Sequence, residues 1–164
     1  MQHDDILKRA SKNDIICYTD GSFKNGFGGA GICIVHPNPM KVERFGASLF
    51  RSTPLLSELV AIELCLLKLI KMTINKDQYV HIFCDSLGAI QTLYLLQRTN
   101  QWFIVSDREV LPTEFIWRLK ILIAHCFFKV RFHHVKAHSG ILGNEQADQI
   151  AKSYCRDSQK SVIY

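Results

Sequence analysis

Hydrophobic positions along the chain alternate between short continuous runs and longer stretches with helical spacing. The short runs are rich in β-branched and aromatic residues and predict five strands, at 15–19, 32–35, 42–50, 79–84 and 129–135. The longer stretches predict four helices, at 53–72, 86–97, 112–126 and 144–154, the last of them capped by Asn144. Three strands followed by alternating helices and strands predict an α/β fold, a mixed sheet covered by helices.

The length of 164 residues suits one domain with a substantial core. The polar stretch 1–13 is expected to be a flexible N-terminal segment, the domain to span 14–157, and residues 158–164 to form a C-terminal tail. Residues 98–111 predict no definite element, and they contain Trp102 and Phe103, which suit either core packing or a stacking surface.

Composition excludes a membrane or secreted protein. The most apolar stretch, Leu55–Ile70, is interrupted by charged residues and is typical of a core helix, and the N-terminus has no apolar signal block. Five of the six cysteines lie inside apolar runs, where a free thiol packs as a small hydrophobe: Cys17, Cys33, Cys65, Cys84 and Cys126. We therefore expect an intracellular protein, in the cytoplasm or nucleus, with reduced thiols and no membrane partner.

The charge of the chain is unevenly distributed. There are 20 basic and 15 acidic residues, giving a formal net charge of +5. Residues 1–117 hold 12 of each sign, whereas residues 118–164 hold eight basic and three acidic residues, so the excess lies in the last third. A modest basic excess favours a polyanionic partner.

Four carboxylates interrupt apolar surfaces. On a helical wheel Glu58 falls on the core side of its helix, while Glu63 falls in a polar sector with Lys68 and Lys71. Each carboxylate also has a plain structural explanation, as a partner of the helix dipole, a turn residue or a helix cap. The other three carboxylates are Asp20 and Asp85, which each end a predicted strand, and Asp148, which follows the predicted cap of the last helix.

Taken together, the four carboxylates favour a metal site. Carboxylates brought close together repel one another unless cations lie between them. Oxygen ligands without Cys or His favour Mg²⁺ or Mn²⁺, and two such ions can activate a water and stabilise the leaving oxygen of a phosphodiester. Whether the four residues converge depends on the fold.

Five ordered motifs resemble those of type 1 ribonuclease H, most closely the domains of retroviruses and retrotransposons. The resemblance covers about Ile15 to Tyr154. Any one motif is weak, but all of them in order make a specific signal. They are Tyr18-Thr19-Asp20-Gly21-Ser22, Ser57-Glu58-Leu59-Val60-Ala61-Ile62, Phe83-Cys84-Asp85-Ser86, Val135-Lys136-Ala137-His138-Ser139-Gly140 and Gly143-Asn144-Glu145-Gln146-Ala147-Asp148.

The resemblance implies a ribonuclease H-like fold, a five-stranded mixed sheet with helices on both faces. It implies that the protein is an endoribonuclease that hydrolyses the RNA strand of RNA–DNA hybrids by a two-metal-ion mechanism and leaves 5′-phosphate products. Two Mg²⁺ ions are implied, with Mn²⁺ as a possible substitute. The implied metal ligands and catalytic residues are Asp20, Glu58, Asp85 and Asp148.

The resemblance also implies a role for the loop before the last helix. His138 matches the histidine that assists proton transfer or product release, work for which an imidazole is suited near neutral pH. Gly140 and Gly143 would let this loop move. His133 and His134 lie on a predicted strand with one side chain inward and one outward, and we assign them no zinc site.

Contacts with the hybrid are implied at three places, and recognition would rest on shape, phosphates and ribose hydroxyls. Arg51 and Lys152 are further phosphate contacts to consider, and a solvated surface role fits these two residues and Lys136 equally. Residues 98–111 are not basic, which predicts a short or absent hybrid-gripping protrusion. The implied contacts are Gly21, Ser22, Phe23, Lys24, Asn25, Thr53, Ser57 and Lys136.

Two other functions remain open beside the active ribonuclease. One is a catalytically silent domain that binds hybrids, and the other is a different nuclease on the same fold, such as a resolvase or exonuclease. The chain begins with Met and contains no polymerase motif, and both a free-standing enzyme and a domain in a reverse transcriptase or polyprotein context stay open. We expect a monomer.

Overall fold

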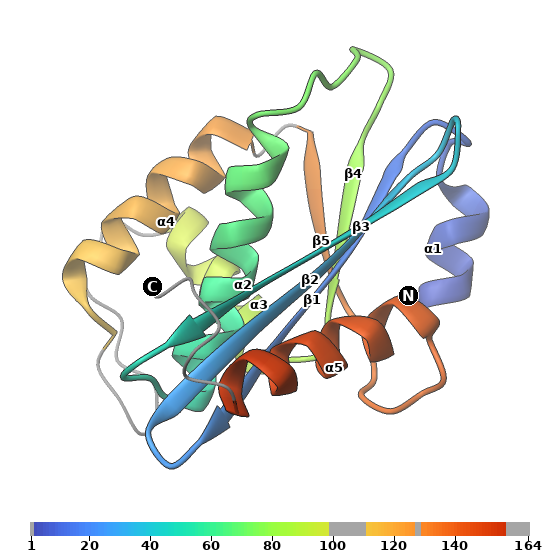
Figure 1. Ribbon diagram of the computed structural model, residues 1–164. Coiled ribbons are helices and arrows are strands. Elements are labelled where there is room, and N and C mark those ends of the chain that lie inside the picture. The colour runs from blue at the N-terminus through green and yellow to red at the C-terminus, as the bar shows by residue number, and fades with distance from the viewer. Residues whose placement is uncertain (1, 99–110, 127–128, 157–164) are drawn as a thin grey trace.

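Five strands form one mixed sheet, in the order β3-β2-β1-β4-β5 (Figure 1). The computed structural model describes residues 2–98, 111–126 and 129–156. The first three strands form an antiparallel meander, and β4 and β5 continue the sheet parallel to β1, as the sequence predicts. Their bounds are β1 Ile15–Lys24, β2 Phe27–His36, β3 Lys41–Leu49, β4 Val80–Cys84 and β5 Val130–His134.

Helices cover both faces of the sheet, which confirms the predicted layers (Figure 1). The larger core lies between the sheet and α2, where Leu59, Ile62 and Leu66 are fully buried. The helices α2 Pro54–Leu69, α3 Leu87–Arg98 and α4 Thr113–Cys126 lie on this side. The opposite side carries α1 His3–Arg9 and α5 Leu142–Arg156, over a smaller cluster that includes Tyr18, Phe83 and Ala147.

The helix α1 corrects the expectation that residues 1–13 form only a flexible segment. Its one buried apolar residue, Ile6, packs into the smaller cluster beside Tyr18 and Phe83. Asp4 and Asp5 lie in its first turn and Lys8 and Arg9 in its last, which complements the helix dipole. The predicted domain boundaries themselves stay a prediction.

Glu63 also departs from the prediction, since it is buried rather than on a polar face. It lies on α2, and Arg118 of α4 donates to its Oε1 at 3.3 Å. Burial raises the pKa of Glu63, and the charge of Arg118 opposes that rise. The helical-wheel argument fails here because α2 is a middle layer, packed against the sheet on one side and α4 on the other.

The first strand runs further than predicted. β1 continues to Lys24 and β2 begins at Phe27, so the glycine-rich stretch 26–31 is mostly strand. Asp20 therefore lies within β1, paired with Gly31 of β2, rather than at a strand end. Only the pairing with β4 stops beside it, at Thr19 and Cys84.

Gly31 lets α5 lie directly on the sheet. A Cβ atom at this position would overlap the backbone of α5 at Ala147 and Ala151. We expect Gly31→Ala to lower the free energy of unfolding by about 2 kcal/mol, as overpacking of a close helix–sheet contact does. It should also weaken any activity that depends on Asp148, because the displaced helix carries that residue. Urea denaturation would measure the stability change.

Gly88→Ala is the matched control for this prediction. A Cβ at Gly88, on α3, meets its nearest neighbour at an ordinary 3.8 Å. Alanine is favoured over glycine within a helix, so the control should be neutral or slightly stabilising. Equal destabilisation by both substitutions would show that the α5 contact is not the cause.

The cysteines agree with the sequence prediction. All six are free, and the five in apolar runs are buried. Within residues 2–98, 111–126 and 129–156, no helix has the length and apolar character needed to cross a membrane. The predictions about Trp102, Phe103 and a missing protrusion lie largely outside the described residues.

Candidate active site

Three of the four candidate carboxylates meet where the pairing of β1 with β4 ends. Asp20 comes from β1, Glu58 from the second turn of α2, and Asp85 directly follows β4. One carboxylate oxygen from each residue lies within 4.8 Å of those of the other two. Gly21 permits this approach, because a Cβ there would overlap the backbone at Ser57 and Glu58.

Asp148 lies beside this group, on α5. Its carboxyl group is close enough to that of Asp20 for each to shift the pKa of the other, and Lys152 forms an ion pair with it at 3.0 Å. It does not belong to the three residues whose oxygens are all within 4.8 Å of one another. Because α5 begins at Leu142, Asp148 lies in the second turn of the helix and not in the first turn, where the sequence predicts it.

Asn144 is not the helix cap predicted from the sequence. It lies inside the first turn of α5, is 2% exposed, and its Nδ2 donates to Oδ2 of Asp85 at 3.4 Å. Its Oδ1 is buried without a hydrogen-bond partner among the described residues. Asn144 and Asp148 are four residues apart and share a helix face, which is the signal that could have placed Asn144 at this site.

Cys84 and His134 are two further contacts that sequence reasoning missed. The buried thiol of Cys84 donates to Oε2 of Glu58 at 3.7 Å. The Nε2 of His134, on β5, is 3.2 Å from the backbone carbonyl of Asp85. Both contacts hold carboxylate-bearing segments in place, and neither adds a metal ligand to the carboxylate group.

Burial and mutual repulsion disturb the protonation of this group. Burial raises the pKa of Asp20 to about 11, with further contributions from the charges of Glu58 and Asp85. Burial likewise raises the pKa of Glu58 to about 7, against a lowering contribution from its hydrogen bond with Asp20. Burial opposes the shift of Asp148, but its bond with Lys152 holds the pKa of that carboxyl below its ordinary value.

These properties fit a divalent cation. Three close oxygen donors, without sulfur or imidazole among them, match the ligand preference of Mg²⁺ and Mn²⁺. Carboxylates that repel one another at neutral pH are stabilised in their charged form when a cation lies between them.

The loop between β5 and α5 carries His138. The imidazole is exposed, and the residue has a left-handed backbone with φ of 54°, as Gly140 has with φ of 83°. The sequence predicts Gly143 in the same loop, but it is the second residue of α5, where a Cβ would overlap the ring of Tyr18.

The predicted hybrid contacts fall into accessible and inaccessible positions. Phe23 and Lys24 are exposed at the end of β1, Asn25 is exposed in the turn that follows, and Lys136 is exposed on the loop before α5. Thr53 caps α2 by accepting from the backbone of Leu56 at 3.1 Å. Ser57 is fully buried and its hydroxyl is hydrogen-bonded to that of Ser52 at 2.7 Å, and its phosphate contact stays a prediction.

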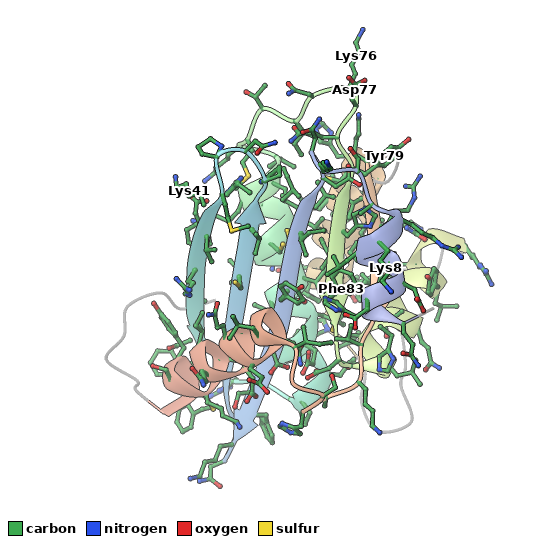
Figure 2. The ribbon with its side chains drawn as sticks, turned by 90° about the vertical axis from the view of Figure 1, so that its right-hand side faces the viewer. Lys8, Lys41, Lys76, Asp77, Tyr79 and Phe83 are labelled. Atoms are coloured by element: carbon green, nitrogen blue, oxygen red, sulfur yellow. The ribbon has the colours of Figure 1, made fainter. Side chains whose placement is uncertain are left out.

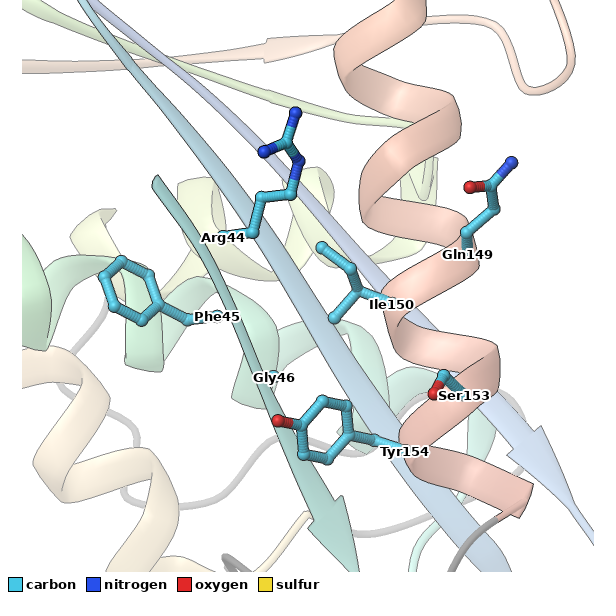
Figure 3. Close-up of a pocket in the computed structure, with 7 residues that line it drawn as sticks. All are labelled: Arg44, Phe45, Gly46, Gln149, Ile150, Ser153 and Tyr154. Atoms are coloured by element: carbon cyan, nitrogen blue, oxygen red, sulfur yellow. The ribbon is translucent and has the colours of Figure 1, made fainter. Parts of the chain in front are cut away.

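A separate hollow of about 350 Å³ lies between β3 and α5 (Figure 3). Arg44 and Tyr154 are among its lining residues, and none of the four candidate carboxylates is. Arg44 already donates to the side chain of Gln146 at 3.2 Å. The candidate site is thus the carboxylate group and not this hollow.

The arrangement of the sheet and helices is similar to that of solved structures of ribonuclease H. LC9-RNase H1, a type 1 RNase H with the type 2 active-site motif, is 18% identical with a TM-score of 0.69, over 87% of this chain and 72% of that one. LC11-RNase H1 in complex with RNA/DNA hybrid is 17% identical with a TM-score of 0.65, over 87% and 97%. The prototype foamy virus protease-reverse transcriptase is 19% identical with a TM-score of 0.71, over 88% of this chain and 21% of that one.

These likenesses define the class of the protein as an α/β protein with the ribonuclease H fold. The family model for RNase H matches residues 12–156. The chain therefore belongs to the RNase H family. No curated protein matches the chain in a sequence search. Family membership supports a nuclease that acts on RNA–DNA hybrids and a general dependence on divalent metal ions.

Proposed function

We propose that this protein is an endoribonuclease that hydrolyses the RNA strand of RNA–DNA hybrids and leaves 5′-phosphate and 3′-hydroxyl ends. The observation that carries the proposal is the convergence of Asp20, Glu58 and Asp85, from three separate elements, in a chain of the RNase H family. Asp148 completes the proposed set through its contact with Asp20. A catalytically silent binding protein would have no chemical need for this costly group of buried acids.

The four carboxylates would hold two divalent cations, Mg²⁺ or Mn²⁺. Such ions, when bound, supply an activated water and stabilise the departing 3′ oxygen of the phosphodiester. Asn144 fixes the orientation of Asp85 through its amide, and Lys152 keeps Asp148 ionised. His138, exposed on the neighbouring loop, is positioned to exchange protons with solvent during turnover or product release.

Hybrid recognition would use the phosphate backbone rather than base edges. The exposed turn at Phe23, Lys24 and Asn25, together with Thr53 and Lys136, is proposed to contact the substrate, with Gly21 and Ser22 approaching through their backbone. Two bound divalent cations would add four charges to the formal net charge of +5, so the loaded protein meets the hybrid as about +9. Binding should therefore weaken as salt rises.

The wider context of the chain stays a prediction. The likeness to the foamy virus protease-reverse transcriptase, of which the chain matches 21%, supports a reverse transcriptase or polyprotein setting. An intracellular location is proposed from composition alone, and the monomeric state stays a prediction.

Cleavage of a defined substrate set tests the proposed function. With Mg²⁺, we expect internal cuts in the labelled RNA strand of an RNA–DNA hybrid, and no cuts in double-stranded DNA or double-stranded RNA of the same sequence. Removing the metal with a chelator should stop cleavage, and raising the salt should increase KM for the hybrid. End-group analysis of the products would identify the 5′-phosphate.

The substrate set separates the remaining functions. Binding of the hybrid without any cut, by protein shown to be folded, would mean a silent binding domain. Preferential cutting of double-stranded DNA or of branched DNA would mean another nuclease on this fold. Either result would contradict the proposal.

A further inference from the structure

The helix α1 packs against two aromatic rings on the strands that lead to the candidate metal site. Tyr18 and Phe83 are register partners on the parallel strands β1 and β4, with ring centroids 5.4 Å apart. Tyr18 lies two residues before Asp20 and therefore on the same face of β1. Phe83 lies two residues before Asp85, which directly follows β4. The pair is therefore close in sequence to two of the candidate ligands, on the two strands that lead to them.

His3 closes this aromatic pair from the side of α1. Its Nε2 is hydrogen-bonded to the Tyr18 hydroxyl at 2.7 Å, and its ring meets Phe83 edge-on with centroids 4.7 Å apart. Tyr18 is 6% exposed and Phe83 is fully buried, so both depend on the cover that α1 supplies with His3 and Ile6. Figure 2 looks onto this face, where Phe83 lies between α1 and α5.

The ring of Tyr18 also packs against α5. Gly143, in the first turn of α5, rests against Tyr18 so closely that a Cβ would overlap the ring. The next residue, Asn144, donates to Asp85, and Asp148 follows one turn later. Two carboxylate-bearing elements, β1 and α5, thus meet at Tyr18, and β4, which leads directly to Asp85, contributes Phe83 beside it.

We propose that His3 is a positioning residue for the metal site, acting through its hydrogen bond with Tyr18. The inference rests on the proposed function and adds an element to it, because α1 precedes residues 12–156 that match the RNase H family model. His3 touches no candidate ligand; it fixes the ring against which the ligand-bearing strands and α5 pack. Its loss should loosen the carboxylates relative to one another, and so weaken metal binding more than hybrid binding.

Two single substitutions isolate the hydrogen bond in the full-length protein. His3→Phe keeps a ring against Phe83 but removes the bond, and Tyr18→Phe removes the same bond from the other side. We expect each to weaken Mg²⁺ binding, measured by titration calorimetry, by about fivefold, the effect of one lost hydrogen bond. The Mg²⁺ concentration for half-maximal cleavage should rise by the same factor, with KM for the hybrid unchanged at saturating metal.

A double variant and two controls sharpen the test. The His3→Phe/Tyr18→Phe protein should be no worse than either single variant, because both changes remove one interaction. His3→Gln retains a group that can bond the Tyr18 hydroxyl and should recover most of the metal affinity. Asp5→Ala, on the exposed side of α1, should leave metal binding and cleavage unchanged.

The proposal would be overturned if His3→Phe lowered the melting temperature but kept the wild-type Mg²⁺ affinity and the wild-type Mg²⁺ concentration for half-maximal cleavage. The helix α1 would then only shield the apolar cluster from solvent. A rise in hybrid KM alone would also overturn it, because α1 would then act on the substrate. If the wild-type protein binds Mg²⁺ but cuts no hybrid, the proposed function fails, and calorimetry of the same variants still decides the role of His3.

Discussion

Changing Asp85 to Asn is expected to lower the rate of hybrid cleavage at least about a thousandfold while the protein stays folded. The substitution keeps the size of the side chain and removes the charge that would hold a cation between Asp20 and Glu58. Metal ions contribute several kcal/mol to phosphodiester hydrolysis, and each loss of about 1.4 kcal/mol is a factor of ten in rate. The value of kcat at saturating hybrid and Mg²⁺ is the measurement.

Folding of the Asp85→Asn protein is checked separately. The amide that replaces the carboxylate of Asp85 can still accept a hydrogen bond from Asn144 through its oxygen, so the melting temperature in chelator should not fall. Asp77→Asn changes an exposed acid in the turn before β4 and should leave kcat unchanged (Figure 2). Cleavage by Asp85→Asn near the wild-type rate would show that the metal site has been assigned to the wrong residues.

Asp20 and Asp85 show that a local sequence pattern can indicate candidate ligands but cannot show how they are arranged in space. An apolar run that ends in a carboxylate is visible in sequence, and parallel neighbouring strands bring such ends to one edge of a sheet. The sequence could not show that β1 continues past Asp20, since that depends on its long-range pairing with β2. Nor could it show that α2 brings Glu58 close to Asp20, which depends on the close contact of α2 with Gly21.

The wrong predictions share a physical cause, the neglect of tertiary neighbours. A helical wheel places Glu63 on a polar face because it assumes solvent on one side, whereas α4 covers that side of α2. The preference of Asn for caps predicts that role for Asn144, whereas the helix begins two residues earlier and turns Asn144 toward Asp85. The helix α1 is seven residues long with one buried apolar position, too short for periodicity to predict it.

Without metal, the free energy of unfolding should fall as pH rises, because of Asp20 and Glu58. Their pKa values in the folded protein, about 11 and about 7, lie above the ordinary values of 3.8 and 4.5. The folded state therefore binds more protons than the unfolded state above about pH 4, and stability falls wherever that is so. The decline should be steepest between pH 4.5 and pH 7, where both groups contribute, and Asp20 extends it to higher pH.

Asp20→Asn should therefore stabilise the metal-free protein at pH 8 by roughly 2 kcal/mol, because it removes the acid with the largest upward shift. Bound Mg²⁺ should reverse this dependence of stability on pH. It should stabilise the wild-type protein increasingly as pH rises, since it binds the ionised cluster of the folded state, and it should barely stabilise Asp20→Asn. Urea denaturation from pH 5 to pH 9, in chelator and in saturating Mg²⁺, measures both effects, and Glu145→Gln, an exposed acid in the first turn of α5, is the control. If chelated Asp20→Asn were less stable than wild type at pH 8, burial and the neighbouring acids would not disfavour the charged form of Asp20, and this argument for cations at the site would fail.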